Sequence, residues 1–295
     1  MQYLYKICGI RVLCEVPFRI SMQRESEEFL DIAPENNVRE DIKMIFRPVD
    51  TLPILLKKGH WENDRLYIEN EDGQKIYHCP TRNSSSYACV TWPEKTGKTG
   101  KTVCCEYVRG MESYMNYSHN LCDLLGLETL LLKENGLLLH SSFIRWRGKG
   151  ILFSAPSGTG KSTQAELWEQ YEGAEILNGD RAGLRKIGGK WTAFGLPLAG
   201  SSFIYRNESA LLEGIVVLCQ AGKNRIRRLK PVEAFRYLYP ETTVHQWHRP
   251  SAEKAVSLLM DLISQVPVFL LECRPDEEAV RLLKETIVGL TTEGD

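Results

Sequence analysis

Apolar and polar residues in the first part of the chain alternate in short runs rich in Ile, Val, Leu and Tyr, a pattern typical of β-strands. Such runs occupy residues 3–16, 42–46, 65–69, 74–78, 87–92 and 103–108. The turn Asn70-Glu71-Asp72-Gly73 predicts a hairpin, because an Asp-Gly pair readily supplies positive φ. The acidic, broken segment 25–41 is predicted to be a loop. The pattern therefore predicts a strand-rich domain over residues 1–112.

The hydrophobic period changes to that of a helix over residues 113–135, which we expect to form one helix connecting two domains. Strands and helices then share the remaining chain, residues 136–295. We predict strands at 137–140, 142–146, 150–154, 174–177, 184–187, 190–194, 212–219 and 266–273. We predict helices at 161–172, 231–239, 251–265 and 276–288, of which the last three begin with a cap or a first-turn proline.

A glycine-rich segment joins the apolar run 151–153 to an amphipathic run. It reads Ala155-Pro156-Ser157-Gly158-Thr159-Gly160-Lys161-Ser162-Thr163. This is the strand, loop and helix order of a phosphate-binding loop, with Ala155 where the strict pattern has its first glycine. Gly158 and Gly160 let backbone N–H groups converge on phosphate oxygens, Lys161 adds a cation, and the Ser162 hydroxyl suits Mg²⁺. The cofactors predicted are ATP and Mg²⁺, with the nucleotide bound by Ser157, Gly158, Thr159, Gly160, Lys161, Ser162 and Thr163.

Asp180 follows the strand 174–177, within Asn178-Gly179-Asp180. An acidic residue at the carboxyl end of a strand beside a phosphate loop is where a Mg²⁺ ligand, or a base for an attacking hydroxyl, is needed. We therefore assign Asp180 a role in catalysis and, with Ser162, in metal binding. Residues 195–202 have the composition of an active-site loop. Two Gly-Lys-Thr copies within residues 93–102 lack the flanking strand and helix, and we interpret them as a basic loop.

Composition and charge exclude several classes of partner. The chain has 37 basic and 38 acidic residues, so its total charge favours no polyanion, and we expect no nucleic-acid partner. No run is long enough to span a membrane and the first residues lack the form of a signal peptide, so we expect a cytoplasmic protein without a membrane partner. The nine scattered cysteines include no C-x-x-C pair, which argues against a disulfide framework and a zinc site. Homo-oligomerisation stays open.

The chain places a hairpin with His140 at its head first, then the phosphate loop, and then the acidic motif. In this order of elements it resembles the HPr kinase/phosphorylase and phosphoenolpyruvate carboxykinase group. The branch most similar consists of stand-alone serine kinases, some of them in gene clusters for ribosomally made peptides. The resemblance covers residues 137 to about 283. It implies an α/β fold, in which residues 136–295 form a phosphate-loop kinase core with a mixed sheet flanked by helices.

Two departures from that group matter. The group usually carries two adjacent aspartates, whereas this chain has Gly179 and Asp180 at those positions. Asp180 must therefore act as metal ligand, as base, or as both, unless another residue supplies one of these roles. The Leu-Glu-Val-Arg-Gly-Leu-Gly signature of true HPr kinases is also missing, which argues against HPr as the acceptor and against the reverse phosphorylase reaction.

The leading hypothesis is transfer of the γ-phosphoryl group of Mg-ATP to a hydroxyl, a serine of a peptide or protein, which would bind residues 1–112. Lys161 and Arg206 would neutralise charge on the transferred group, as Arg225 and Arg227 also could. His140 would accept the hydroxyl proton or orient the acceptor. The alternative is that His140 has only a structural role. The alternatives are a kinase for a small metabolite and a nucleotide-gated peptide-binding protein without transferase activity.

Overall fold

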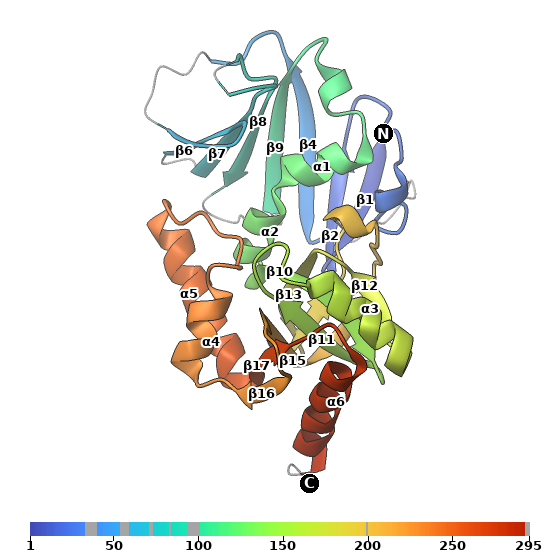
Figure 1. Ribbon diagram of the computed structural model, residues 1–295. Coiled ribbons are helices and arrows are strands. Elements are labelled where there is room, and N and C mark those ends of the chain that lie inside the picture. Colours follow the sequence, from blue (N-terminus) through green and yellow to red (C-terminus); the bar gives the residue numbers. More distant parts are fainter. Residues whose placement is uncertain are drawn as a thin grey trace. The chain divides into compact units, whose positions relative to one another are not determined.

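The computed structural model describes residues 1–32, 40–53, 59–70, 73–82, 84–93, 101–198 and 200–292. The chain divides into two compact units, Met1–Gly126 and Leu127–Asp295, each built on its own sheet (Figure 1). The protein is therefore a mixed α/β protein with two sheets and a strand-rich N-terminal part. Within the described ranges no helix is long and apolar enough to cross a membrane.

The first unit has a nine-stranded sheet in the order β3-β1-β2-β4-β9-β8-β7-β6-β5. Its strands are β1 (Gln2–Ile7), β2 (Ile10–Glu15), β3 (Leu30–Ile32), β4 (Ile42–Val49), β5 (His60–Glu62), β6 (Arg65–Asn70), β7 (Gly73–His78), β8 (Ala88–Pro93) and β9 (Lys101–Val108). β4 runs parallel to β2 and β9, and the other neighbours are antiparallel. The predicted strands are confirmed, and the run 3–16 proves to be the hairpin of β1 and β2.

Part of the predicted loop 25–41 is wrong, because Leu30–Ile32 forms the edge strand β3. Leu30 is buried and pairs with Tyr5 of β1, so an apolar contact overrides the acidic composition around it. Residues 33–39 lie outside the described part of the chain. So do the turn residues 71 and 72 and residues 94–100, which hold most of the Gly-Lys-Thr segment.

The predicted single helix over 113–135 is also wrong. The structure has a 3-10 turn at Glu112–Tyr114 and two helices, α1 (Ser118–Leu125) and α2 (Leu127–Lys133). Gly126 ends α1 with a left-handed backbone, φ 65°, and its N–H donates to the carbonyls of Cys122 and Asp123. The leucine spacing continues across this break, so the hydrophobic pattern alone does not reveal it. The two compact units divide at the same glycine.

The second unit has an eight-stranded sheet in the order β11-β10-β13-β14-β15-β17-β16, with β12 also paired to β10. Its strands are β10 (Gly136–Trp146), β11 (Lys149–Ser154), β12 (Glu175–Asn178), β13 (Arg181–Ile187), β14 (Lys190–Phe194), β15 (Ser209–Gln220), β16 (Arg225–Arg228) and β17 (Val268–Cys273). β15 is parallel to β11 and β17, and the other pairs are antiparallel. The carboxyl ends of β11, β15 and β17 therefore meet at one edge of the sheet, where the phosphate loop begins.

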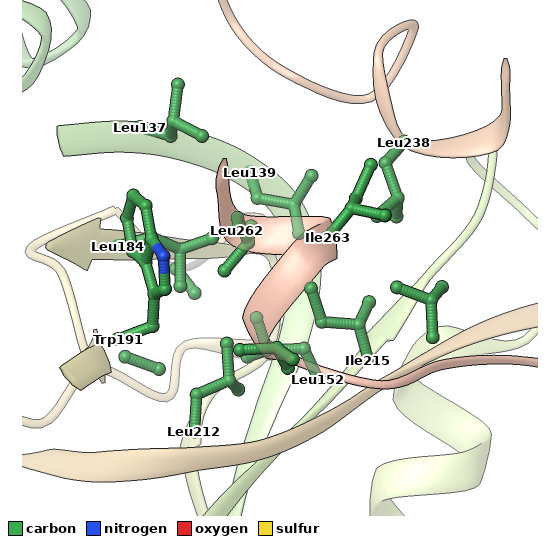
Figure 2. Packing of buried hydrophobic residues seen from close by; sticks show 14 of the residues in the cluster. Leu137, Leu139, Leu152, Leu184, Trp191, Leu212, Ile215, Leu238, Leu262 and Ile263 are labelled. Atoms are coloured by element: carbon green, nitrogen blue, oxygen red, sulfur yellow. The ribbon is translucent and has the colours of Figure 1, made fainter. Parts of the chain in front are cut away.

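Helices cover both faces of this sheet: α3 (Lys161–Glu172), α4 (Pro231–Leu238), α5 (Arg249–Gln265) and α6 (Glu277–Thr292). Successive side chains of a strand point to opposite faces, and Leu152 and Phe153 of β11 accordingly enter different apolar clusters. Leu152 packs in the cluster that includes residues of α4 and α5, part of which Figure 2 shows. Phe153 packs with residues of α3 and α6. The hydrophobic clusters thus fix α3, which carries the end of the phosphate loop.

The anchoring of α3 can be tested at Trp168, which is fully buried and packs edge-on against Trp146 with ring centroids 5.3 Å apart. We expect Trp168→Ala to lower the free energy of unfolding of the second unit by about 3–5 kcal/mol, because it leaves a large cavity. Tyr171→Ala, on the exposed side of the same helix, should cost less than about 0.5 kcal/mol. Denaturant unfolding followed by circular dichroism measures both, and equal losses would contradict the packing.

Candidate active site

The loop between β11 and α3 has the backbone that a phosphate cradle requires. Gly158 and Gly160 have φ values of 78° and 113°, in the left-handed region that favours glycine. Gly160 is the N-cap of α3, and no side chain caps this helix end. The predicted nucleotide ligands Ser157 and Ser162 are both exposed. N–H groups of the loop and the helix start can therefore serve an anion.

Lys161 is buried, with 7% of its surface exposed, although it carries a charge. Its Nζ donates to the carbonyl oxygens of Ala155 at 2.7 Å and Pro156 at 3.3 Å, which holds the ammonium against the loop. Burial lowers the pKa of Lys161, while the carboxylates of Glu241 and Asp180 raise it. The lysine therefore lies within electrostatic reach of both carboxylates.

Asn178, at the end of β12, organises the backbone around Asp180. Its buried side-chain amide donates to the carbonyl oxygens of Leu196 at 2.9 Å and Leu198 at 2.8 Å. Its Oδ1 accepts from the N–H groups of Asp180 and Arg181, both at 2.9 Å. One side chain thus ties the strand end to the acidic residue and to the loop 195–202. The sequence places Asn178 in the acidic motif but gives no sign of this role.

His140 lies between two carboxylates. Its Nδ1 is 2.7 Å from Oε2 of Glu241, and its Nε2 is 3.6 Å from Oδ1 of Asp180. The facing carboxylate of Asp180 raises the pKa of His140, burial lowers it, and Glu241 raises it further. In turn His140 lowers the pKa of Asp180, with burial opposing and Arg181 assisting. The arrangement favours an imidazolium beside an ionised Asp180.

Glu241 was missed by the sequence analysis. It follows α4 and lies 101 residues from His140 in the chain. Backbone hydrogen bonds bring it there: the His140 N–H donates to the Glu241 carbonyl at 2.9 Å, and the Thr243 N–H donates to the Leu138 carbonyl at 2.8 Å. No local motif marks this residue. Arg181 was missed too, although it follows Asp180 directly, and its Nε lies 3.3 Å from the Asp180 Oδ2.

The loop 195–202, expected to belong to an active site, packs against the acidic motif. A Cβ added to Gly179 would lie 2.2 Å from Oγ and 2.3 Å from Cβ of Ser202. A Cβ on Gly200 would lie 2.9 Å from Cγ of Asp180. This close approach explains the glycine at position 179, because a side chain there would collide with Ser202. Ala199 lies outside the described residues.

The candidate arginines are placed differently from one another. The Arg206 N–H donates to the Leu177 carbonyl at 3.0 Å, which puts its backbone beside the end of β12, and its side chain is exposed. Its role in catalysis stays a prediction. Arg227, on the strand β16, forms two hydrogen bonds to Glu233 in the first turn of α4, at 2.9 and 3.1 Å. This pairing favours a structural role for Arg227.

The donor types at the site fit Mg²⁺ in combination with a nucleotide. Mg²⁺ prefers oxygen ligands and usually keeps several waters, binding through one or two protein groups plus phosphates. The exposed Ser162 hydroxyl and the ionised Asp180 carboxylate are oxygen donors of this kind. Across the described ranges, no group of three or more His, Cys, Asp or Glu residues could hold a metal ion by itself.

The sequence matches no protein-family profile, and no curated protein matches it. Among solved structures, the HPr(Ser) kinase/phosphatase from Coxiella burnetii is similar over 53% of this chain and 93% of its own. The sequence identity is 15% and the TM-score is 0.32. This is a distant, partial likeness of fold. We therefore base the function on the residues of the site.

The packing at Gly179 gives a direct test. We expect Gly179→Ala to destabilise the second unit by about 1–3 kcal/mol, because its methyl group collides with Ser202. Adding Ser202→Gly should recover most of this loss, since the substitution removes both colliding atoms. Thermal unfolding of the single and double variants measures the effect. Equal destabilisation of both variants would show that the loop does not lie against Gly179.

Proposed function

We propose that the second unit binds Mg-ATP and that the protein transfers the γ-phosphoryl group to a hydroxyl, a serine of a peptide or protein. The observation that carries this proposal is the position of Lys161. The lysine of a phosphate loop lies within electrostatic reach of an aspartate and a histidine–glutamate pair at the same edge of the sheet. Phosphoryl transfer depends mainly on such positioning and on charge neutralisation.

In this proposal the loop holds the nucleotide. Backbone N–H groups around Gly158 and Gly160 cradle the phosphates, and Lys161 turns its ammonium from the loop carbonyls towards the terminal phosphates. Ser162 and Asp180 would hold Mg²⁺, which supplies further neutralisation of phosphate charge when bound. The residues of the chain thereby orient the γ-phosphoryl group towards Asp180.

The hydroxyl oxygen of the acceptor attacks the γ-phosphorus as the bond to the β-phosphate oxygen breaks, and ADP leaves. The hydroxyl proton passes to the carboxylate of Asp180. His140 lowers the pKa of Asp180 and so makes it a weak base, but a loose transition state needs the proton to be accepted only late. Glu241 holds the imidazole ring through Nδ1, so that Nε2 faces Asp180.

The acceptor-binding role expected for residues 1–112 belongs to the proposal as well. Peptides can bind by adding a strand to the edge of a sheet. In the described part of the first unit the edges are β3 and β5, each three residues long. An edge this short offers few backbone groups for strand addition.

We expect Lys161→Ala to raise the Kd for Mg-ATP at least about tenfold, because a charge-assisted contact with the phosphates is lost. Lys190→Ala provides the control, since this exposed lysine lies at the start of β14. Isothermal titration calorimetry measures both values. If the Lys161 variant binds Mg-ATP as tightly as the parent, the nucleotide site has been misassigned.

We expect Asp180→Asn to lower the rate of phosphoryl transfer by about 10²–10⁴-fold while changing the Kd for Mg-ATP by less than about threefold. The amide keeps the shape of the side chain and an oxygen atom for Mg²⁺, but it loses the charge and cannot take the proton. Mass spectrometry of a serine-peptide pool incubated with ATP and Mg²⁺ measures transfer as the gain of one phosphate. Transfer at the parent rate would exclude Asp180 as the base.

Glu241→Gln tests the positioning of His140. The substitution removes a carboxylate that raises the pKa of His140, so this pKa should fall, and transfer should slow while Mg-ATP affinity is kept. The imidazole signals in an NMR pH titration measure the shift independently of activity. A pKa equal to that of the parent would mean that Glu241 does not hold the ring in solution.

A further inference from the structure

Phe203 has an unusual conformation beside the proposed site. Its φ is 53°, in the left-handed region that is a genuine outlier for a bulky side chain. Its surface is also 76% exposed, more than that of most large apolar residues in the described ranges. The left-handed backbone costs free energy, and burial of the ring does not offset that cost. Strained residues of this kind cluster at functional sites.

The segment that carries Phe203 is fixed against the acidic motif. Ser202, its neighbour in the chain, packs against Gly179, and Gly200 packs against Asp180. The amide of Asn178 holds the start of the same loop by two hydrogen bonds. The backbone at Phe203 is therefore fixed in position. It directly follows Ser202, which contacts the acidic motif that contains Asp180.

We propose that Phe203 contacts an apolar side chain next to the acceptor hydroxyl. This proposal rests on the proposed phosphoryl transfer and deepens it. The acceptor class becomes a peptide or protein whose serine is flanked by an apolar or aromatic residue. Such a residue gains from covering an exposed ring, because the contact removes apolar surface of both partners from water. A small charged metabolite would gain nothing from Phe203.

An aromatic ring could instead stack on the base of the nucleotide. The triphosphate, however, separates the base from the phosphoryl group that is transferred, and Phe203 belongs to the loop that packs on Asp180, at the acceptor end. The phosphate loop is contacted by another element, β15, where Nε2 of Gln220 donates to the carbonyl oxygen of Thr159 at 3.3 Å. The geometry therefore favours the acceptor over the base.

The experiment uses the full chain and three peptides that differ only in the residues flanking one serine, which are Leu, Lys or Asp. We expect the parent to prefer the leucine peptide in kcat/KM by at least about tenfold, the size of one apolar contact. Phe203→Ala and Phe203→Gly should remove this preference, and Phe203→Leu should keep part of it. Val232→Ala, at an exposed apolar position on α4, should keep it in full.

The glycine variant separates recognition from structure. Because glycine adopts positive φ without strain, Phe203→Gly should raise the Tm by roughly 2–4 °C while it removes the preference. A residue with only a structural role would not produce this combination. A Tm equal to that of the parent would contradict the strain, and an unchanged preference would overturn the proposal. If Phe203→Ala bound Mg-ATP more weakly than the parent, the ring would contact the nucleotide base. That result would also overturn the proposal.

Failure of the proposed function gives a different result. If the parent phosphorylates none of the three peptides, phosphoryl transfer to serine peptides is refuted. Binding of the same peptides to the protein saturated with Mg-ADP, measured by calorimetry, then decides the inference alone. Tighter binding of the leucine peptide that is lost in Phe203→Ala would support the contact. Equal binding of all three peptides, or no binding, would overturn it.

Discussion

The buried amide of Asn178 is the constraint on which the candidate site depends. Its two donors and its oxygen are engaged by four backbone groups, which belong to the acidic motif and to the loop that follows β14. A buried polar group left without a partner costs about 1–3 kcal/mol, so the amide and its four partners stabilise one another in a single arrangement. The orientation of Asp180, and the contact of the loop with it, follow from that arrangement.

The sheet of the second unit supplies the frame for this constraint. Parallel strands bring their carboxyl ends to one edge, and the two apolar clusters fix the helices on both faces. Polar groups then gather where the strands end. The carboxylates of Asp180 and Glu241 raise the pKa values of His140 and Lys161 against the effect of burial, and His140 in turn lowers the pKa of Asp180. Such mutual shifts are typical of sites that move protons or bind charged ligands.

The predictable part of this protein is local in the sequence. The phosphate loop, the helix 161–172 and the hairpins follow from periodicity, glycines and turn residues, and the structure reproduces the predicted bounds of that helix. The break at Gly126 was missed because leucines continue on both sides of it. Glu241 was missed because only backbone pairing with β10 brings it to His140. The glycine at position 179 has a reason that only the packing of Ser202 reveals.

We propose that the residues at this edge of the sheet transfer phosphate from ATP to a serine. The most direct measurement gives the full-length protein ATP labelled in the γ-phosphate, Mg²⁺ and a peptide pool, with a matched pool in which alanine replaces serine. We expect label on the serine peptides and none on the alanine peptides. Binding of Mg-ATP with no label on any acceptor would contradict it and would favour a nucleotide-gated binding protein.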